Sequence, residues 1–236
     1  MNASDRLLIS VYLNPVANGI YAIASKIPTV CSSIFSVFSI TWQQTSSEMI
    51  NDKDRDLYFG QVFNKMIILL VTLCAGVVSI NYFLFNIVFD ASYMEGQFYA
   101  PILVTSTIFL SLSQYFGGIE IALKRPKENS ITTIIGAIVN FTVDFALINH
   151  IGLYAAALST LIANIVVMIC RKIRLGKVVK IRVRKKVLPL ILFYLYILAC
   201  SFLDLSIVFV VCNVVLAGIV FVFANRDCAP RQGRVV

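Results

Sequence analysis

The chain has 236 residues, of which 59% are hydrophobic and 14% are charged, and its formal net charge is +8. Soluble domains carry about 25% charged residues, so this much apolar surface cannot all be buried inside a soluble fold of this length. The composition therefore excludes an ordinary soluble domain. The positive charge does not indicate nucleic-acid binding, because nearly all Lys and Arg lie in the short gaps between apolar runs.

Taken in chain order, seven segments are apolar over roughly the 20 residues that a helix needs to cross the hydrocarbon of a bilayer. They must be helices, because backbone groups in lipid have to be paired within the segment, and the runs lack the alternation of barrel strands. The predicted spans are 19–43, 66–89, 101–122, 130–149, 151–170, 187–203 and 206–224. We therefore expect an all-α, polytopic bundle of about seven transmembrane helices.

Basic residues alternate from one connection to the next. Lys and Arg occur in 44–65, 123–129, 171–186 and the C-terminal tail, whereas 90–100, 149–152 and 204–206 hold none. Cationic loops stay on the cytoplasmic side, so we expect a multi-pass protein of a bacterial cytoplasmic membrane with its N-terminus outside and its C-terminus in the cytoplasm. An outside N-terminus without a visible signal peptide suggests that part of the protein is missing upstream.

The span pattern divides the chain into four parts. These are a five-span unit over 1–172, a basic cytoplasmic loop over 173–186, two further spans over 187–224 and a cytoplasmic tail over 225–236. The basic loop is either a solvated loop of the kind expected on the cytoplasmic side, or a contact for anionic lipid headgroups, worth about 1 kcal/mol per basic residue near the surface.

The first predicted span carries a polar stripe. Its members recur at steps of four and three and are Ser25, Thr29, Ser32, Ser36, Ser39 and Gln43. Lys26 stands at the edge of the stripe, seven residues after Gly19 and so about 10 Å into the helix. Pro28 should kink the helix there. The stripe is either a packing surface for a neighbouring helix or the wall of a hydrated substrate pathway, and Lys26 could also snorkel outward without a role.

Two carboxylates fall inside later spans. Asp144 lies mid-span, where an ionised carboxylate costs about 2.5–3.5 kcal/mol. It is either a proton- or cation-coupling site together with Asn140, or a structural carboxylate hydrogen-bonded to Asn140 one turn away. Glu120 is expected to be an interfacial partner of Lys124, four residues later.

Small residues in 151–170, among them Ala155, Ser159 and Ala163, predict a tightly packed helix face. The sequence contains no nucleophile–base set, no phosphate-binding glycine loop and no cysteine or histidine spacing typical of a metal site. We therefore expect neither an enzyme nor a bound cofactor.

Two stretches resemble polysaccharide flippases, the O-antigen and teichoic-acid exporters of the MOP (MATE-like) transporter superfamily. Ser4-Asp5-Arg6 and Gly19–Lys26 resemble the D-R and G-[IV]-Y-x-x-A-x-[KR] patterns that end the seventh helix and open the eighth in that family. The stretch from Asn140 to Thr160 resembles N-x-x-h-N followed by L-I and G-h-x-G-A-A-h-[AS]-T. It departs from that pattern at Asp144 and Ala155, which replace an Asn and a Gly.

The resemblance extends over residues 4–224 and aligns with the second half of proteins that have 12 to 14 helices in two lobes. It implies that this chain is the C-terminal lobe of a flippase for undecaprenyl-diphosphate-linked oligosaccharide, driven by an ion gradient or the membrane potential. As partners it implies that lipid-linked substrate, membrane lipids and the N-terminal half.

The resemblance also assigns roles to residues of the first helices. It implies that Lys26 is the cavity cation that draws the diphosphate and that Arg6 is a weaker second cation. Ser32, Ser36 and Gln43 would line the hydrated wall. Two alternatives stay open: a MATE-like protein that exports small molecules, and a non-transporting scaffold or remnant, since one lobe cannot form a two-lobed cavity alone.

Overall fold

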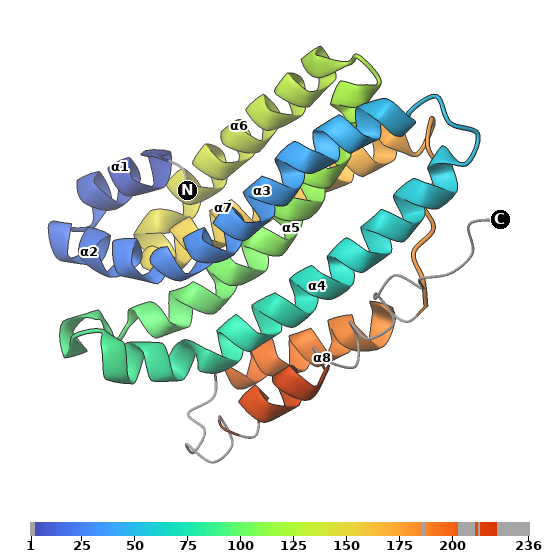
Figure 1. The fold of residues 1–236 in the computed structure, drawn as a ribbon. Helices are drawn as coiled ribbons and strands as arrows, with labels where there is room; N and C mark the ends of the chain where they lie inside the picture. Colours follow the sequence, from blue (N-terminus) through green and yellow to red (C-terminus); the bar gives the residue numbers. More distant parts are fainter. Residues whose placement is uncertain (1–2, 186, 203–210, 212, 221–236) are drawn as a thin grey trace.

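The computed structural model describes residues 3–185, 187–202, 211 and 213–220, and over these ranges the chain is a helical bundle (Figure 1). No strand occurs in the described ranges, so the predicted all-α class is confirmed. The elements are α1 (Ala3–Tyr12), α2 (Pro15–Ala24), α3 (Lys26–Met49), α4 (Arg55–Phe83), the π-helical turn η1 (Leu84–Val88), the 3-10 turn η2 (Ala91–Tyr93), α5 (Gly96–Ala122), α6 (Pro126–Ile151), α7 (Leu153–Leu175) and α8 (Val187–Cys200).

Within the described residues, four helices are long and apolar enough to cross a membrane, namely α4 continued by η1, α5, α6 and α7, and the bent pair α2–α3 would make a fifth. These five correspond to the first five predicted spans. The sixth, predicted at 187–203, coincides with α8, whose 14 residues fall short of the length that a span needs. The seventh, 206–224, lies largely outside the described residues, as does the tail 225–236. The described ranges therefore contain four or five of the predicted spans.

The first predicted span is two helices rather than one. α2 and α3 meet at Ser25 with a bend of 42°. Pro28 has no N–H for the carbonyl of Ala24, and its ring crowds that carbonyl, so the helix opens in the turn before the proline. The kink expected from Pro28 is thus confirmed. Lys26, however, is the first residue of α3 at the break and does not lie within a continuous helix.

α5 is the centre of the bundle (Figure 1). It packs against α2, α3, α4, α6 and α7. Of its most apolar 18-residue stretch, 83% is buried inside the protein. Its hydroxyl groups are compatible with this burial because they bond to their own helix: Ser106 Oγ donates to the Leu103 carbonyl at 2.8 Å and Thr107 Oγ1 to the Val104 carbonyl at 2.7 Å. A central helix with small polar side chains lets its neighbours approach closely without leaving polar groups unpaired.

α3 approaches α5 closely at Gly118. A Cβ atom at Gly118 would lie 2.7 Å from Cδ1 of Trp42, so only glycine leaves room for the indole. The indole N–H of Trp42 donates to the Tyr115 carbonyl at 2.9 Å, and its ring stacks on the ring of Tyr115 with centroids 4.5 Å apart. This contact fixes α3, and with it the stripe of polar residues on that helix, against the centre of the bundle.

The two ends of the bundle differ in charge. The connections α3–α4, α5–α6 and α7–α8 lie at one end, and the connections α1–α2, α4–α5 and α6–α7 lie at the other (Figure 1). The first three carry the basic loops of the sequence, whereas 89–95 and 149–152 at the opposite end contain no Lys or Arg. This arrangement agrees with the alternation read from the sequence, and the side that faces the cytoplasm stays a prediction.

Candidate functional site

A group of buried polar side chains joins α1 and α2 to α6 and α7. We call it the acidic cluster, and it comprises Ser4, Asp5, Tyr21, Asn140, Asp144, Ser159 and Thr160. Its two carboxylates come from different helices, Asp5 from α1 and Asp144 from α6. Both residues, like Asn140, are 0% exposed.

α6 contributes to the acidic cluster from a buried face whose residues are spaced four positions apart. Its buried residues are Thr132, Gly136, Asn140, Asp144 and Ile148, which form one ridge along the helix. Gly136 lets this ridge approach α7, because a Cβ there would clash with the side chain of Val167.

The turn into α7 depends on Gly152, whose φ of 56° and ψ of −132° favour glycine. This turn brings α7 back along α6. Ala155, Ser159 and Ala163 are all buried on α7, so the tightly packed face predicted for this segment is confirmed.

Asn140 is the hydrogen-bonding centre of the acidic cluster. Its amide nitrogen donates to Ser159 Oγ at 3.2 Å and to Thr160 Oγ1 at 3.3 Å, and its carbonyl oxygen accepts from Ser4 Oγ at 3.3 Å. One side chain therefore connects α6 with both α7 and α1.

Asp5 completes the connection between the helices. Its Oδ2 accepts a hydrogen bond from Thr160 Oγ1 at 3.0 Å and a longer one from the Tyr21 hydroxyl at 3.4 Å. Tyr21 is itself fully buried on α2. The position of α1 and α2 against α7 thus depends on donors that converge on one carboxylate oxygen.

The acidic cluster lacks enough donors for its carboxylates. Within the described part of the chain, Oδ1 of Asp5 and both carboxylate oxygens of Asp144 have no hydrogen-bond partner. None of the ion pairs between described residues includes either side chain. Asp144 lies one turn after Asn140 on the buried ridge of α6, and Asn140 accepts a hydrogen bond from Ser4, the residue before Asp5. A buried carboxylate without a donor or a counter-ion is costly, so this arrangement favours binding of a proton or a small cation.

The chemistry of the donors suits such a ligand. The acidic cluster offers carboxylate, amide and hydroxyl oxygens, which are the ligands that hard cations prefer. Among the residues that the structure describes, no group of three or more His, Cys, Asp or Glu comes together.

Both predicted ion-coupling residues, Asn140 and Asp144, lie in this cluster. The alternative in which Asp144 is held by a hydrogen bond from Asn140 is wrong, because both oxygens of Asp144 are without a partner and Asn140 donates to α7 instead. Sequence reasoning did not single out Asp5 and Thr160 as site residues. The signal was present, since each lies in one of the two stretches that resemble flippases.

The two predicted substrate-binding cations lie outside the acidic cluster. Lys26 is exposed at the start of α3, and Arg6 is exposed on α1, one residue after the buried Asp5. Each cation is nevertheless close in sequence to a member of the acidic cluster. Arg6 directly follows Asp5, and Lys26 follows Tyr21 by five positions.

The polar stripe of α3 lies at the margin of the buried face of that helix. Ser32 and Gln43 are half-buried, Ser36 is exposed and Ser39 is buried against the bundle. Ser32 Oγ donates to the Pro28 carbonyl at 2.9 Å, and Ser36 Oγ donates to the Ser33 carbonyl at 2.7 Å. The stripe thus serves partly as a packing surface, and its exposed part leaves hydroxyl acceptors facing outward.

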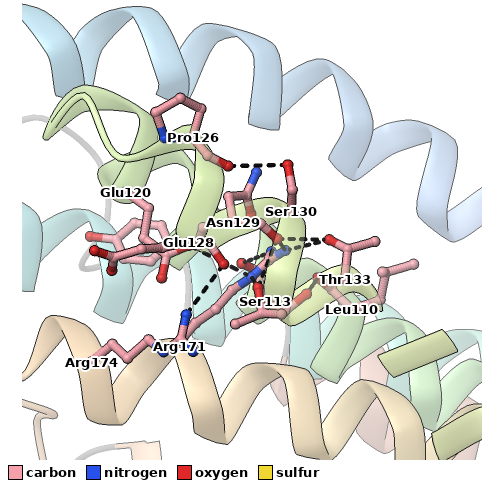
Figure 2. A network of polar contacts seen from close by, with 12 residues as sticks. Leu110, Ser113, Glu120, Pro126, Glu128, Asn129, Ser130, Thr133, Arg171 and Arg174 are labelled. Atoms are coloured by element: carbon pink, nitrogen blue, oxygen red, sulfur yellow. Dashed lines mark hydrogen bonds and ion pairs between the residues drawn. The ribbon is translucent and has the colours of Figure 1, made fainter. Parts of the chain in front are cut away.

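A second buried polar group lies near the basic end of the bundle and corrects two expectations (Figure 2). Glu120 is almost fully buried and pairs with Arg171, whose Nε lies 3.9 Å from Glu120 Oε2, so it is not an interfacial partner of Lys124. Arg171 was expected in a cytoplasmic loop, but α7 continues to Leu175 and carries it inside the bundle. Its guanidinium donates to the Ser113 carbonyl at 2.8 Å and to Thr132 Oγ1 at 3.0 Å.

Gly117 provides the space for this guanidinium, because a Cβ there would lie 2.8 Å from Nη1 of Arg171. Further bonds run from Nη2 of Arg171 to Thr133 Oγ1 at 3.0 Å and to the Asn129 carbonyl at 3.3 Å. Arg171 therefore ties α7 to both α5 and α6, and this group acts as a structural anchor.

No protein-family model, no curated protein and no solved structure matches this chain.

Replacing Arg171 with Met should strongly destabilise the protein. The substitution leaves Glu120 buried without its counter-ion, and breaking a buried pair in this way costs about 3–5 kcal/mol. Adding Glu120→Gln to Arg171→Met removes the orphaned charge and should recover part of the loss. Thermal unfolding in detergent measures both effects. A single variant as stable as the native chain, or a double variant no better than the single one, would contradict the anchor.

Proposed function

We propose that this chain is the C-terminal lobe of a flippase that moves an undecaprenyl-diphosphate-linked oligosaccharide across a bacterial cytoplasmic membrane for the synthesis of surface polysaccharide. The acidic cluster would be its ion-coupling site. The observation that carries the proposal is a pair of buried carboxylates with unpaired oxygens inside an apolar helical bundle. Ionisable groups in such a position usually serve ion or proton pathways.

Both stretches that resemble flippases contribute to this one cluster. Asp5 comes from the first stretch, and Asn140, Asp144 and Thr160 come from the second, more than 130 residues later in the sequence. Their convergence in space supports reading the two weak motifs as parts of one site.

The contacts suggest how ion binding would act on the substrate side. A bound proton or cation would neutralise the carboxylates of Asp5 and Asp144 and hold α1 against α6, whereas its release would leave two like charges that repel each other. α2 is tied to the same site through Tyr21 and continues into α3 through the bend at Ser25. Movement of α2 would therefore shift Lys26, the first residue of α3.

The substrate side of the proposal rests on charge. Lys26 and Arg6 are exposed cations outside the basic end, and a diphosphate is a ligand that such side chains bind well. Ser32, Ser36 and Gln43 would line the hydrated wall beside them. Exposed cations speak against a MATE-like exporter of cationic drugs, and a measurable ion response would speak against an inert remnant.

Ion binding should stabilise the purified chain. Sodium chloride, compared with N-methylglucamine chloride at equal ionic strength, or else a lowered pH, should raise the unfolding temperature, because a ligand at 100 times its Kd adds about 2.7 kcal/mol. Asp144→Asn should abolish this response.

Asp90→Asn is the matched control, since Asp90 is an exposed carboxylate in the turn at η2. It should leave the response intact. An ion response that persists unchanged in Asp144→Asn, or the absence of any response in the native chain, would refute the coupling site.

The substrate role of Lys26 is tested in the cell that produces the protein. Lys26→Ala should reduce surface polysaccharide at least about tenfold, because it removes a charged contact worth about 1.5–3 kcal/mol, while membrane insertion stays normal. Lys26→Arg should retain export. Lys124→Ala, which removes an exposed cation at the basic end, is the control. Unchanged export in Lys26→Ala would exclude this residue from the substrate path.

A further inference from the structure

The basic loop between α7 and α8 contains an extended segment that we call the strap, residues 178–185. Its sequence alternates apolar and basic residues, so the two kinds face opposite sides of an extended chain. Val179, Ile181 and Val183 line a small cavity together with Phe63 and Phe116 at the bundle. The basic residues on the other side of the strap are Lys180, Arg182 and Arg184.

The strap is held in place by side chains of α4. The Asn64 amide nitrogen donates to the Arg182 carbonyl at 2.8 Å, and its Oδ1 accepts from the backbone N–H of Arg184 at 2.7 Å. Asp56 Oδ2 accepts from the backbone N–H of Lys180 at 3.2 Å. These three bonds pair the backbone of the strap with α4.

These three side chains line a pocket of about 380 Å³ against the first turns of α4. The lining residues are Asp56, Leu57, Gly60, Gln61, Asn64, Lys180, Arg182 and Arg184. Three cations thus face a single carboxylate. That carboxylate is already engaged, since Asp56 Oδ1 lies 3.5 Å from Nε of Arg55. The excess charge favours an anionic ligand with several acceptor oxygens, such as a phosphate group.

The position of the pocket identifies the source of the phosphate. The pocket is lined by the first turns of α4. The start of this helix lies at the basic end of the bundle (Figure 1), and its long apolar stretch follows. Leu57, on the rim, is 64% exposed and gives the pocket an apolar neighbour. A phospholipid would contact the cations with its phosphate and Leu57 with its acyl chain, whereas a free phosphate would contact only the cations.

We propose that the strap and the first turns of α4 form a binding site for the headgroup of an anionic phospholipid. The phosphate would contact Lys180, Arg182 and Arg184, and the acyl chains would pass beside Leu57. The bound lipid would hold the strap against α4. This site lies apart from the acidic cluster, and it does not depend on the proposed flippase function.

The test is a lipid titration of the full chain in neutral detergent, with binding followed by native mass spectrometry. Short-chain phosphatidylglycerol should bind more tightly than phosphatidylcholine of the same chain length. Each basic residue near a membrane surface contributes about fivefold in affinity, so Lys180→Gln/Arg182→Gln/Arg184→Gln should weaken phosphatidylglycerol binding on the order of 100-fold. The matched control Lys124→Gln/Lys127→Gln/Lys177→Gln removes the same charge from exposed positions outside the pocket and should retain binding.

Three outcomes would overturn the site: equal losses in both triple variants, equal binding of phosphatidylcholine, or glycerol 3-phosphate binding as tightly as the lipid. Gln61→Glu is a second variant that tests the site even if the triple variant does not fold. It keeps all three cations, adds one negative charge at an exposed pocket position, and should weaken phosphatidylglycerol binding about fivefold. Unaltered binding in Gln61→Glu would contradict the proposal.

Discussion

A charge inside a lipid-facing bundle has to find a counter-ion, a set of donors or a proton, because neither lipid nor the apolar interior can solvate it. This chain meets that constraint in two different ways. Arg171 is surrounded by carbonyl and hydroxyl oxygens from α5 and α6 and has Glu120 beside it. Asp5 and Asp144 have fewer donors than oxygens in the described part of the chain. Glu120 accepts no hydrogen bond in the described part of the chain, but Arg171 is its counter-ion. Asp5 and Asp144 have no such counter-ion among the described residues, and this difference favours a ligand at the acidic cluster.

The acidic cluster joins the arm formed by α1 and α2 to the rest of the bundle. It lies between the α1–α2 arm and the α6–α7 pair, and it is the contact through which Asp5 and Tyr21 attach that arm. α2 is also the half of a broken span whose other half, α3, is fixed to α5 by the Trp42 contact. The bend at Ser25 therefore separates a part whose position can depend on ion occupancy from a part that is anchored. In the transport hypothesis, Lys26 stands at that boundary.

The sequence predicted well whatever depends on local composition. Apolar length predicted the first five spans, Pro28 predicted the bend, and the small residues of α7 predicted close packing. It predicted poorly what depends on contacts between distant segments. Glu120 was paired with Lys124 because four residues separate them along one helix, yet its partner is Arg171, 51 positions away. Asp5 was noted only as part of a motif, since nothing near it in sequence shows that it faces α6. The sequence leaves open whether the basic loop is solvated or contacts lipid, and only the fold shows that Lys180, Arg182 and Arg184 line a pocket beside α4.

In the proposed mechanism, ion occupancy of the acidic cluster sets the position of the α1–α2 arm against α6. The most direct measurement is the distance between spin labels at Leu7 and Ile138, which are exposed on α1 and α6, introduced into a cysteine-free chain and measured by pulsed electron paramagnetic resonance. With sodium present or at low pH, the distance distribution should be short and narrow. After removal of sodium at neutral pH, it should lengthen and broaden. A distribution that is the same in all these conditions would contradict the claim.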